Sequence, residues 1–259
     1  MKYFVWKSFY YGKKMFIWSI YLLFALYIYF LIYSSETLGA QLFFGSIGFV
    51  VLCIVGLFEH LKIVYEKMIY ALNVHCDLEE AARLKEQLKR KDLFNGFKQS
   101  IIIFDSLLLL DAGKYTDCLA HLDKHQKFFH GTLDYLFIYY HTQMYCYSFL
   151  KDEKNLTIAF EKLFQLKDKQ KKKMRGLFSW HEISGLQYFH QQRNQKCLQE
   201  LALIDTARLN NRELSYLLYL QGHCLLKLNK PSEGNRLLKK ARTIGNTLAI
   251  VQVIQNGGI

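Results

Sequence analysis

Two long runs of apolar residues near the N-terminus contain no charged side chain: residues 15–34 and residues 41–58. Each is about long enough to cross a bilayer core of roughly 30 Å as a helix that rises about 1.5 Å per residue. The intervening stretch "SETLGA" carries a single charge, Glu36. Two such runs in tandem do not suit a soluble core, and the first is too long for an ordinary signal peptide. The pattern predicts a transmembrane hairpin over residues 15–58.

Lysine residues flank this hairpin on the side of both chain ends. The segment 1–14, "MKYFVWKSFYYGKK", mixes aromatic and basic residues, as is typical of a stretch lying among lipid headgroups. Its predicted membrane-surface residues are Lys2, Lys7, Lys13 and Lys14. Because cytoplasmic flanks are enriched in Lys and Arg, we expect a two-span protein of the cell membrane with its N-terminus and its C-terminal domain in the cytoplasm.

The remainder of the chain is expected to be helical, because the whole sequence contains only one Pro and 15 Gly and strand-rich folds usually need more turn residues. No Pro interrupts residues 41–72, and no Gly follows Gly56 there, so the second span is predicted to continue as one helix beyond the membrane. From residue 62 onward, the pattern repeats: a helix, a short turn, and a second helix with a small residue in its first half.

This pattern resembles the tetratricopeptide repeat, which places a small and then a large apolar residue in each helix of a pair. The quoted positions in three units are Ser106, Leu109, Cys118 and Leu122; Gly185, Tyr188, Cys197 and Leu201; and Gly222, Leu225, Gly234 and Leu238. Weaker units begin near Lys62, with Ala81 in its second helix, and at Phe137, with Met144, Tyr147, Leu156 and Phe160. The units start 37 to 41 residues apart, beyond the about 34 of the standard repeat.

The resemblance implies an all-α protein: a two-helix transmembrane hairpin followed by a tetratricopeptide-like α-solenoid of about five helix pairs. The solenoid is assigned to residues 62–246, and residues 247–259 form a C-terminal capping helix and tail. Leu248, Val251 and Ile254 can share one face of that helix, whereas Ile250 and Val253 lie elsewhere. This apolar surplus indicates either a fully packed cap or a contact with a second copy of the chain.

Cys118, His121 and His125 occur at a spacing that places three soft metal ligands on one helical face. The same spacing is explained by packing, because Cys118 occupies the small-residue position that recurs as Ala81, Cys197 and Gly234. A metal site would also need a further ligand that the sequence does not reveal. We therefore predict no bound metal and no cofactor, and the six dispersed cysteines are interpreted as free thiols.

No motif of an enzyme is present. The pair His181-Glu182 lacks the second His of a helical zinc-protease motif, and the chain contains none of the Gly-rich phosphate loops or the nucleophile-elbow pattern. We predict that the protein is not an enzyme.

The chain is basic, with a formal net charge of +12. Its densest basic run, residues 167–175, is interpreted as a solvated loop, with contact to the anionic inner leaflet as the alternative. Its residues predicted for the membrane surface are Lys171, Lys172, Lys173 and Arg175. The run lacks interleaved aromatic residues, so nucleic acid is not favoured as a partner.

The resemblance implies a concave groove lined by the first helix of each pair. Carried over to this chain, the partner-binding residues are His141, Tyr145, Phe149, Glu182, Phe189, His190, Tyr216, Tyr219, His223 and Lys227. Aromatic side chains are enriched at binding hot spots. Because three of these residues are histidines, we also expect an acidic peptide to bind better at pH 6 than at pH 8.

The function expected from these features is that of a membrane-tethered adaptor, which binds a protein or peptide partner on the cytoplasmic side and contacts lipid through its N-terminal hairpin. The alternative is an accessory or immunity-type membrane protein whose hairpin acts on a transporter or toxin.

Overall fold

The computed structural model describes the backbone of residues 2–167 and 179–256 and the side chains from residue 18 onward within these ranges. All regular elements in this part of the chain are helices, so the all-α prediction is confirmed. The chain divides into two compact units, Met1–Lys62 and Ile63–Ile259.

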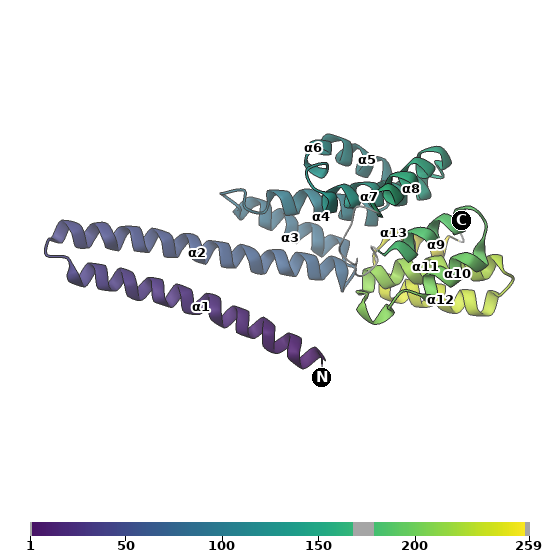
Figure 1. The fold of residues 1–259 in the computed structure, drawn as a ribbon. Coiled ribbons are helices and arrows are strands. Elements are labelled where there is room, and N and C mark those ends of the chain that lie inside the picture. Colours follow the sequence, from purple (N-terminus) through teal and green to yellow (C-terminus); the bar gives the residue numbers. More distant parts are fainter. Residues whose placement is uncertain (1, 168–178, 257–259) are drawn as a thin grey trace. The chain divides into compact units, whose positions relative to one another are not determined.

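The first unit is a helical hairpin. It contains α1 (Lys2–Ser34) and the first part of α2 (Leu38–Asn73), which run antiparallel on either side of a short turn (Figure 1). The two helices approach closely at Gly48, where an added Cβ would lie 2.6 Å from Cγ2 of Ile28. Near the other end of the hairpin, the Tyr21 hydroxyl donates a hydrogen bond of 3.3 Å to Glu59. The absence of a side chain at Gly48 thus allows the two helices to approach closely.

Among the described residues, one helix is long and apolar enough to cross a membrane, namely α2. Only 6% of its apolar window is buried, which distinguishes it from the core helix of a soluble protein. The described apolar part of α1, Trp18–Ser34, is shorter. By length and composition, one of the two predicted spans therefore meets the requirement for crossing a membrane.

Helix α2 is unbroken from Leu38 to Asn73, in agreement with the prediction of a continuous helix. Its last turns belong to the second unit, where Val64, Met68 and Leu72 are buried.

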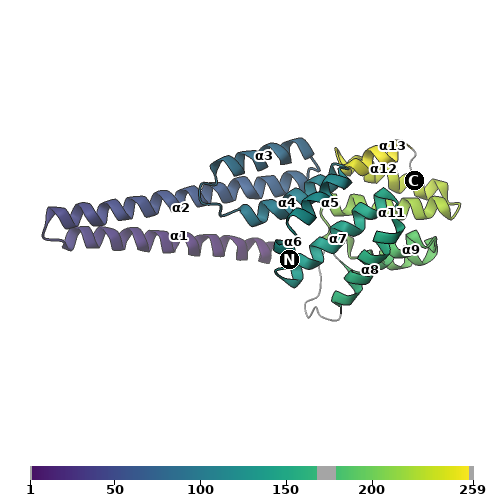
Figure 2. The same ribbon diagram turned by 90° about the horizontal axis from the view of Figure 1, so that it is seen from above.

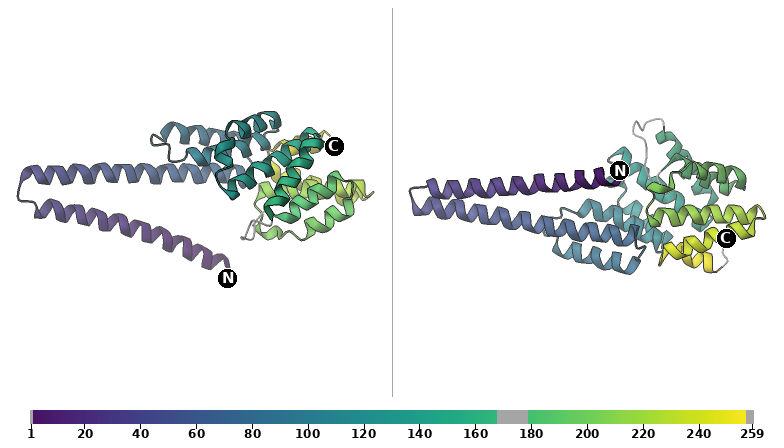
Figure 3. Two further views of the ribbon diagram at one scale, coloured as in Figure 1. Left: turned by 45° about the horizontal axis from the view of Figure 1, so that its top comes forward. Right: turned by 90° about the horizontal axis from the view of Figure 1, so that it is seen from below.

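The second unit contains helices packed mainly against their neighbours in the chain (Figures 2 and 3). The bounds of the helices are α3 (Leu78–Lys91), α4 (Lys98–Asp111), α5 (Tyr115–Lys124), α6 (Gln126–Phe129), α7 (Leu133–Leu150), α8 (Glu153–Lys167), α9 (Trp180–His190), α10 (Asn194–Ala202), the 3₁₀ turn η1 (Thr206–Arg208), α11 (Asn211–Lys227), α12 (Pro231–Gly245) and α13 (Ala249–Gln255).

Local sequence signals explain where several of these helices begin. The side chains of Asp77, Thr132 and Ser179 each accept a hydrogen bond from a backbone N–H in the first turn of the following helix. Asn210 and Glu213 form a complete capping box at α11. Pro231 lies at the first position of α12, where a backbone N–H would have no acceptor within the helix, so proline costs no hydrogen bond there.

The small residues predicted for the helix pairs lie where paired helices are closest. An added Cβ on Gly222 of α11 would lie 2.7 Å from Cγ of Leu238 and 3.1 Å from the carbonyl oxygen of Gly234, both on α12. Gly185 of α9 meets Leu201 of α10 in the same way, at 2.7 Å from Cδ2. In the α4–α5 pair, Cys118 donates from its thiol to the Ser106 carbonyl at 3.3 Å. Three helix pairs thus share one pattern of close contact.

The end of the second unit is bonded to its beginning. The Thr247 hydroxyl donates to the Cys76 carbonyl at 2.8 Å and accepts from the Leu78 amide at 2.9 Å, and the Asn246 side chain donates to the His75 carbonyl at 3.0 Å. In addition, Ala249 packs against Gly113, whose positive φ of 73° closes the α4–α5 turn. The C-terminal segment is therefore fixed against the α2–α3 turn and the α4–α5 turn.

This packing corrects one expectation about the tail. Ile250 was expected to lie outside the packed face, yet its exposed fraction is 0%, equal to that of Leu248. Val253 is half-buried. The reason is that α13 contacts α11 as well as α12, so more than one face of this short helix is covered. Ile250 therefore no longer supports the hypothesis that this helix contacts a second copy of the chain.

The close approach at Gly222 gives a stability prediction. Gly222→Val adds three carbon atoms where Leu238 and the Gly234 backbone leave no space, so it should destabilise the second unit by about 2 kcal/mol or more. Urea unfolding of the full chain in detergent, followed by Trp180 fluorescence in a Trp6→Phe, Trp18→Phe background, measures this loss. Gly56→Val is the control, because nothing lies within 4 Å of a Cβ at that position. An unchanged urea midpoint for Gly222→Val would contradict the close packing.

Candidate functional site

The ten predicted groove residues fall into two groups in the structure. Five are buried in the second unit, with exposed fractions of 1% to 6%: His141, Tyr145, Glu182, Tyr216 and His223. The other five are half-buried or exposed: Phe149, Phe189, His190, Tyr219 and Lys227. His141, Tyr145, Glu182 and Tyr216 are enclosed by the protein in this conformation, whereas His223 is covered by the ring of Tyr219, one of the second group. A binding role for the second group remains a prediction.

A buried ion pair joins α4 to α11. The Arg212 guanidinium donates to both carboxylate oxygens of Asp111, from Nε at 2.5 Å and from Nη2 at 3.0 Å. The Tyr216 hydroxyl donates to the same carboxylate at 2.8 Å. Asp111 is fully buried and Arg212 is 5% exposed. Burial alone would lower the pKa of Arg212, but the carboxylate of Asp111 raises it above its ordinary value. The guanidinium of Arg212 is therefore charged inside the core.

A second buried cluster joins α7 to α9. The Tyr145 hydroxyl donates to Oε1 of Glu182 at 2.5 Å, and the His141 Nε2 atom lies 3.0 Å from the same oxygen. The other carboxylate oxygen of Glu182 is buried and has no hydrogen-bond partner. Burial, with the Glu182 charge as the next cause, raises the pKa of Tyr145 well above its ordinary value. Tyr145 is therefore a neutral hydrogen-bond donor.

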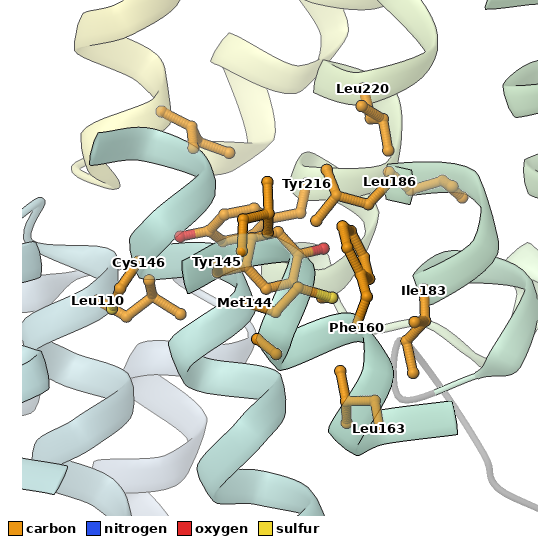
Figure 4. Close-up of a cluster of buried hydrophobic side chains, with 14 of the residues drawn as sticks. Leu110, Met144, Tyr145, Cys146, Phe160, Leu163, Ile183, Leu186, Tyr216 and Leu220 are labelled. Carbon is orange, nitrogen blue, oxygen red and sulfur yellow. The ribbon is translucent and has the colours of Figure 1, made fainter. Parts of the chain in front are cut away.

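Two tyrosine rings connect these clusters. Tyr145 and Tyr216 lie edge to face with centroids 5.3 Å apart, and Figure 4 shows the two side chains next to each other among leucine and isoleucine residues. Burial raises the pKa of Tyr216 well above its ordinary value, and the neighbouring Asp111 has the next largest effect. Two hydrogen-bonded clusters, joined to each other by one ring contact, thus span the core from α4 to α9.

The five accessible groove residues, together with Tyr115, form a single surface that we call the aromatic surface. Phe149 stacks on Tyr115 with centroids 4.8 Å apart and contacts Tyr219 at 6.1 Å. On the neighbouring helices, the Lys227 ammonium lies 5.3 Å from the centroid of the Phe189 ring. These residues come from the C-terminal parts of α7, α9 and α11 and from the start of α5.

His190 belongs to this surface and has two partners. Its Nδ1 atom lies 3.2 Å from a carboxylate oxygen of Glu153, and its Nε2 atom lies 2.7 Å from the Ser148 hydroxyl. Since a carboxylate only accepts, Nδ1 carries the proton and the neutral ring accepts from Ser148 through Nε2. His190 is therefore held in one orientation.

His223 lies directly beneath the aromatic surface. Its ring contacts Tyr219 edge to face at 4.5 Å, and its Nε2 atom is buried without a hydrogen-bond partner. Burial, followed by the positive charge of Lys227, lowers the pKa of His223 to about 4. A neutral imidazole nitrogen is thus left unsatisfied next to the aromatic rings, which costs free energy in the isolated protein.

The expected preference for pH 6 over pH 8 is not supported by these histidines. Burial lowers the pKa of His223 to about 4, so this ring remains neutral across that range, and burial lowers the pKa of His190 as well. His141 is buried against Glu182 and has no access to a partner. The physical reason is desolvation, which opposes the charged form of an imidazole.

The residues first considered for metal binding have other partners. Cys118 is buried, and its thiol is in hydrogen-bond contact with Cys146, which raises the pKa of Cys146. His121 Nε2 lies 2.9 Å from the Ile102 carbonyl. Within residues 18–167 and 179–256, no group of three His, Cys, Asp or Glu side chains is arranged to hold a metal ion.

Nothing in the structure places the predicted membrane-surface residues relative to a membrane. Lys2, Lys7, Lys13 and Lys14 lie on α1, before the first described side chain. Lys171, Lys172, Lys173 and Arg175 lie outside the described residues.

Sequence reasoning missed Asp111 and Arg212, the most strongly bonded polar residues of the two clusters. Each stands in its helix as an ordinary charged residue at a helix end. One signal in the sequence indicated this pair: Asp111 directly follows four leucines in "LLLLDAG". A carboxylate in such an apolar stretch is expected to be at least partly buried and to need a partner.

Comparison of the chain with protein families, with curated proteins and with solved structures finds no match.

The buried ion pair gives a prediction that separates charge from packing. Arg212→Met leaves Asp111 buried without its cation and should destabilise the second unit by about 3–5 kcal/mol. The double variant Asp111→Leu/Arg212→Met removes both charges and should recover at least half of that loss. The measurement is the urea midpoint reported by Trp180. A double variant as unstable as the single one would show that the pair matters through shape and not through charge.

His223 gives a prediction about acid stability. Its folded-state pKa of about 4 lies below the ordinary value of 6.5, so the neutral form is favoured by folding. The associated stability is present above pH 6.5 and is lost as the pH falls from 6.5 toward 4, by about 3 kcal/mol in total. His223→Phe should flatten this part of the pH profile of unfolding. His181→Phe is the control, because the side chain of His181 is 47% exposed. An equal slope in wild type and His223→Phe would refute the assignment.

Proposed function

We propose that this protein is a membrane-tethered adaptor whose second unit is a tetratricopeptide-like solenoid of about five helix pairs. The solenoid proposal is supported by the close contacts at Ser106–Cys118, Gly185–Leu201 and Gly222–Gly234, which lie at the small-residue positions of the repeat. Two thiol contacts recur in one register as well. Cys118 meets Cys146, and Cys197 meets Cys224, each time between a second helix and the first helix of the next pair.

The membrane anchor is proposed to be the helical hairpin of the first unit, with two spans and both chain ends on the cytoplasmic side. Its support is the exposure of large apolar side chains on both helices: Leu22, Leu23 and Tyr33 on α1 and Leu42 and Phe49 on α2 are all more than 60% exposed. Contact of such side chains with lipid tails costs no free energy, whereas their exposure to water is unfavourable. The Lys-rich flanks supply the proposed orientation.

The partner is proposed to bind on the aromatic surface, and the unsatisfied His223 Nε2 atom beneath it carries this proposal. A buried polar atom without a partner is rare in folded proteins. A partner that forms a hydrogen bond with this nitrogen, through a hydroxyl or amide group, would remove the cost of leaving it unpaired. The surrounding rings of Phe149, Phe189 and Tyr219 offer contact area at low entropic cost.

The chemistry of this surface describes the partner segment. It should present an aromatic or aliphatic anchor to the rings and a hydroxyl or amide group to His223. An acidic side chain nearby would complement Lys227, which is exposed and stacked on Phe189. The proposed partner is therefore a short protein segment of mixed apolar and acidic character.

Site-specific photo-crosslinking in the native membrane tests this proposal. A photoreactive phenylalanine analogue at Phe189 should give a discrete crosslinked partner, whereas the same analogue at Tyr188 of the same helix should not. With that partner purified, the triple variant Phe149→Ala/Phe189→Ala/Tyr219→Ala should weaken binding more than tenfold, since loss of hot-spot rings costs a few kcal/mol. Tyr188→Ala, the matched control, should stay within threefold of wild type.

The outcome decides between the two functions considered. If binding survives the triple variant in a folded protein but is lost when the hairpin is exchanged for an unrelated one, the adaptor proposal fails and the accessory function of the hairpin replaces it. Binding that strengthens markedly between pH 8 and pH 6 through His223 would contradict the pKa of about 4 of that ring.

A further inference from the structure

A second polar site lies in the first half of the second unit, away from the aromatic surface. It is a pocket of about 380 Å³ bounded by α3, α4, α5 and the loop between α3 and α4. This volume is in the range of small-molecule sites. The side chains that matter for its chemistry are Lys89, Lys98, Asp105, His121, Lys124 and His125.

The lysines that line this pocket have few carboxylate partners. Lys89 lies 3.7 Å from Glu86, an exposed contact of small energetic value. Lys98 and Lys124 form no ion pair within the part of the chain that the structure describes. The pocket therefore holds at least two ammonium groups without a counter-charge.

The two aspartates that line the pocket, Asp92 and Asp105, bond to groups other than Lys98 and Lys124. Asp92 accepts the backbone N–H groups of Gly96 and Phe97, at 2.9 Å and 2.8 Å, and so closes the loop before α4. Asp105 lies 2.8 Å from the ammonium group of Lys85 on α3. Neither carboxylate forms an ion pair with Lys98 or Lys124, and the lining holds three lysines (Lys89, Lys98 and Lys124) against these two carboxylates, so the pocket has a net positive charge.

The histidines face the same space. Since a carbonyl oxygen only accepts, the 2.9 Å contact between His121 and the Ile102 carbonyl places a proton on Nε2 of His121. The His125 ring lies beside it with centroids 4.7 Å apart. Burial lowers the pKa of His125, and His121, Lys124 and Lys98 lower it further against the opposing effect of Asp105. Positive groups from α4 and α5 thus surround His125.

We propose that this pocket binds a phosphate-bearing ligand, with Lys98 and Lys124 as the charged contacts and His125 as a third donor. Several cations that converge from two helices match an anion with more than one negative oxygen better than they match a single carboxylate. The same cations would repel a metal ion. The ligand is either a free phosphate compound or a phosphorylated lipid headgroup, because both present the same group.

The site also has a built-in dependence on pH. A bound dianion would favour the protonated form of His125 and raise the pKa of that ring, so ligand and proton bind together. Affinity for phosphate should therefore increase as the pH falls through the range in which His125 gains its proton. The aromatic surface carries no comparable set of cations, so failure of this proposal would leave the adaptor proposal intact.

The test uses the full chain in neutral detergent with inorganic pyrophosphate as the probe. The His125 resonance, assigned by its loss in His125→Gln, is followed by NMR across pH with and without the probe. We expect the pKa of His125 to rise on binding, and Lys98→Ala and Lys124→Ala each to weaken binding at least tenfold by calorimetry. Lys127→Ala, which removes the same charge one turn away and outside the pocket lining, should bind within twofold of wild type.

A second arm distinguishes the two sources of the phosphate group. The full chain is placed in nanodiscs of phosphatidylcholine with or without phosphatidic acid. A shift of the His125 pKa that requires phosphatidic acid and Lys98 identifies a lipid headgroup, whereas a shift with pyrophosphate in neutral nanodiscs identifies a free compound. The proposal is overturned if neither probe shifts His125, or if Lys127→Ala weakens binding as much as Lys124→Ala.

Discussion

The second unit depends on one constraint: two opposite charges, on Asp111 and Arg212, are buried together in its core. Removing such charges from water costs several kcal/mol, and only close pairing in good geometry offsets this cost. The two residues are 101 positions apart, so the pair forms only when the end of α4 meets the start of α11. Tyr216 donates to the same carboxylate and brings its ring against Tyr145. The position of α11 in the core therefore determines that of α7.

This constraint explains why the predicted groove is only partly accessible. Where α11 is drawn toward α4, the first helices of the pairs contact one another and enclose His141, Tyr145 and Glu182. Toward the C-terminal ends of the same helices, the rings of Phe149 and Phe189 remain half-buried. The buried polar clusters and the aromatic surface thus lie at different positions along the same helices.

The sequence predicted the helical class and the small residues between paired helices, because these follow from local spacing. Gly185 and Gly222 could be identified by their position in the repeat, and the structure places both against large side chains of the next helix. The ion pair could not be found in this way. A charge at a helix end, such as Asp111, looks the same in a sequence whether it faces solvent or a partner far along the chain. The burial of Ile250 depends likewise on α11, which no local pattern reveals.

The bonds from Asn246 and Thr247 to the α2–α3 turn have a consequence for synthesis of the chain. In a simple stack of repeats, each helix pair contacts only its neighbours, so the first pairs can fold while later ones are still on the ribosome. Here the carbonyl groups of His75 and Cys76 receive their partners from residues about 170 positions later. The earliest pair must therefore remain incomplete until residues 246 and 247 have left the ribosome. The last step of folding of this unit thus waits for residues far along the chain, although most of its contacts are local.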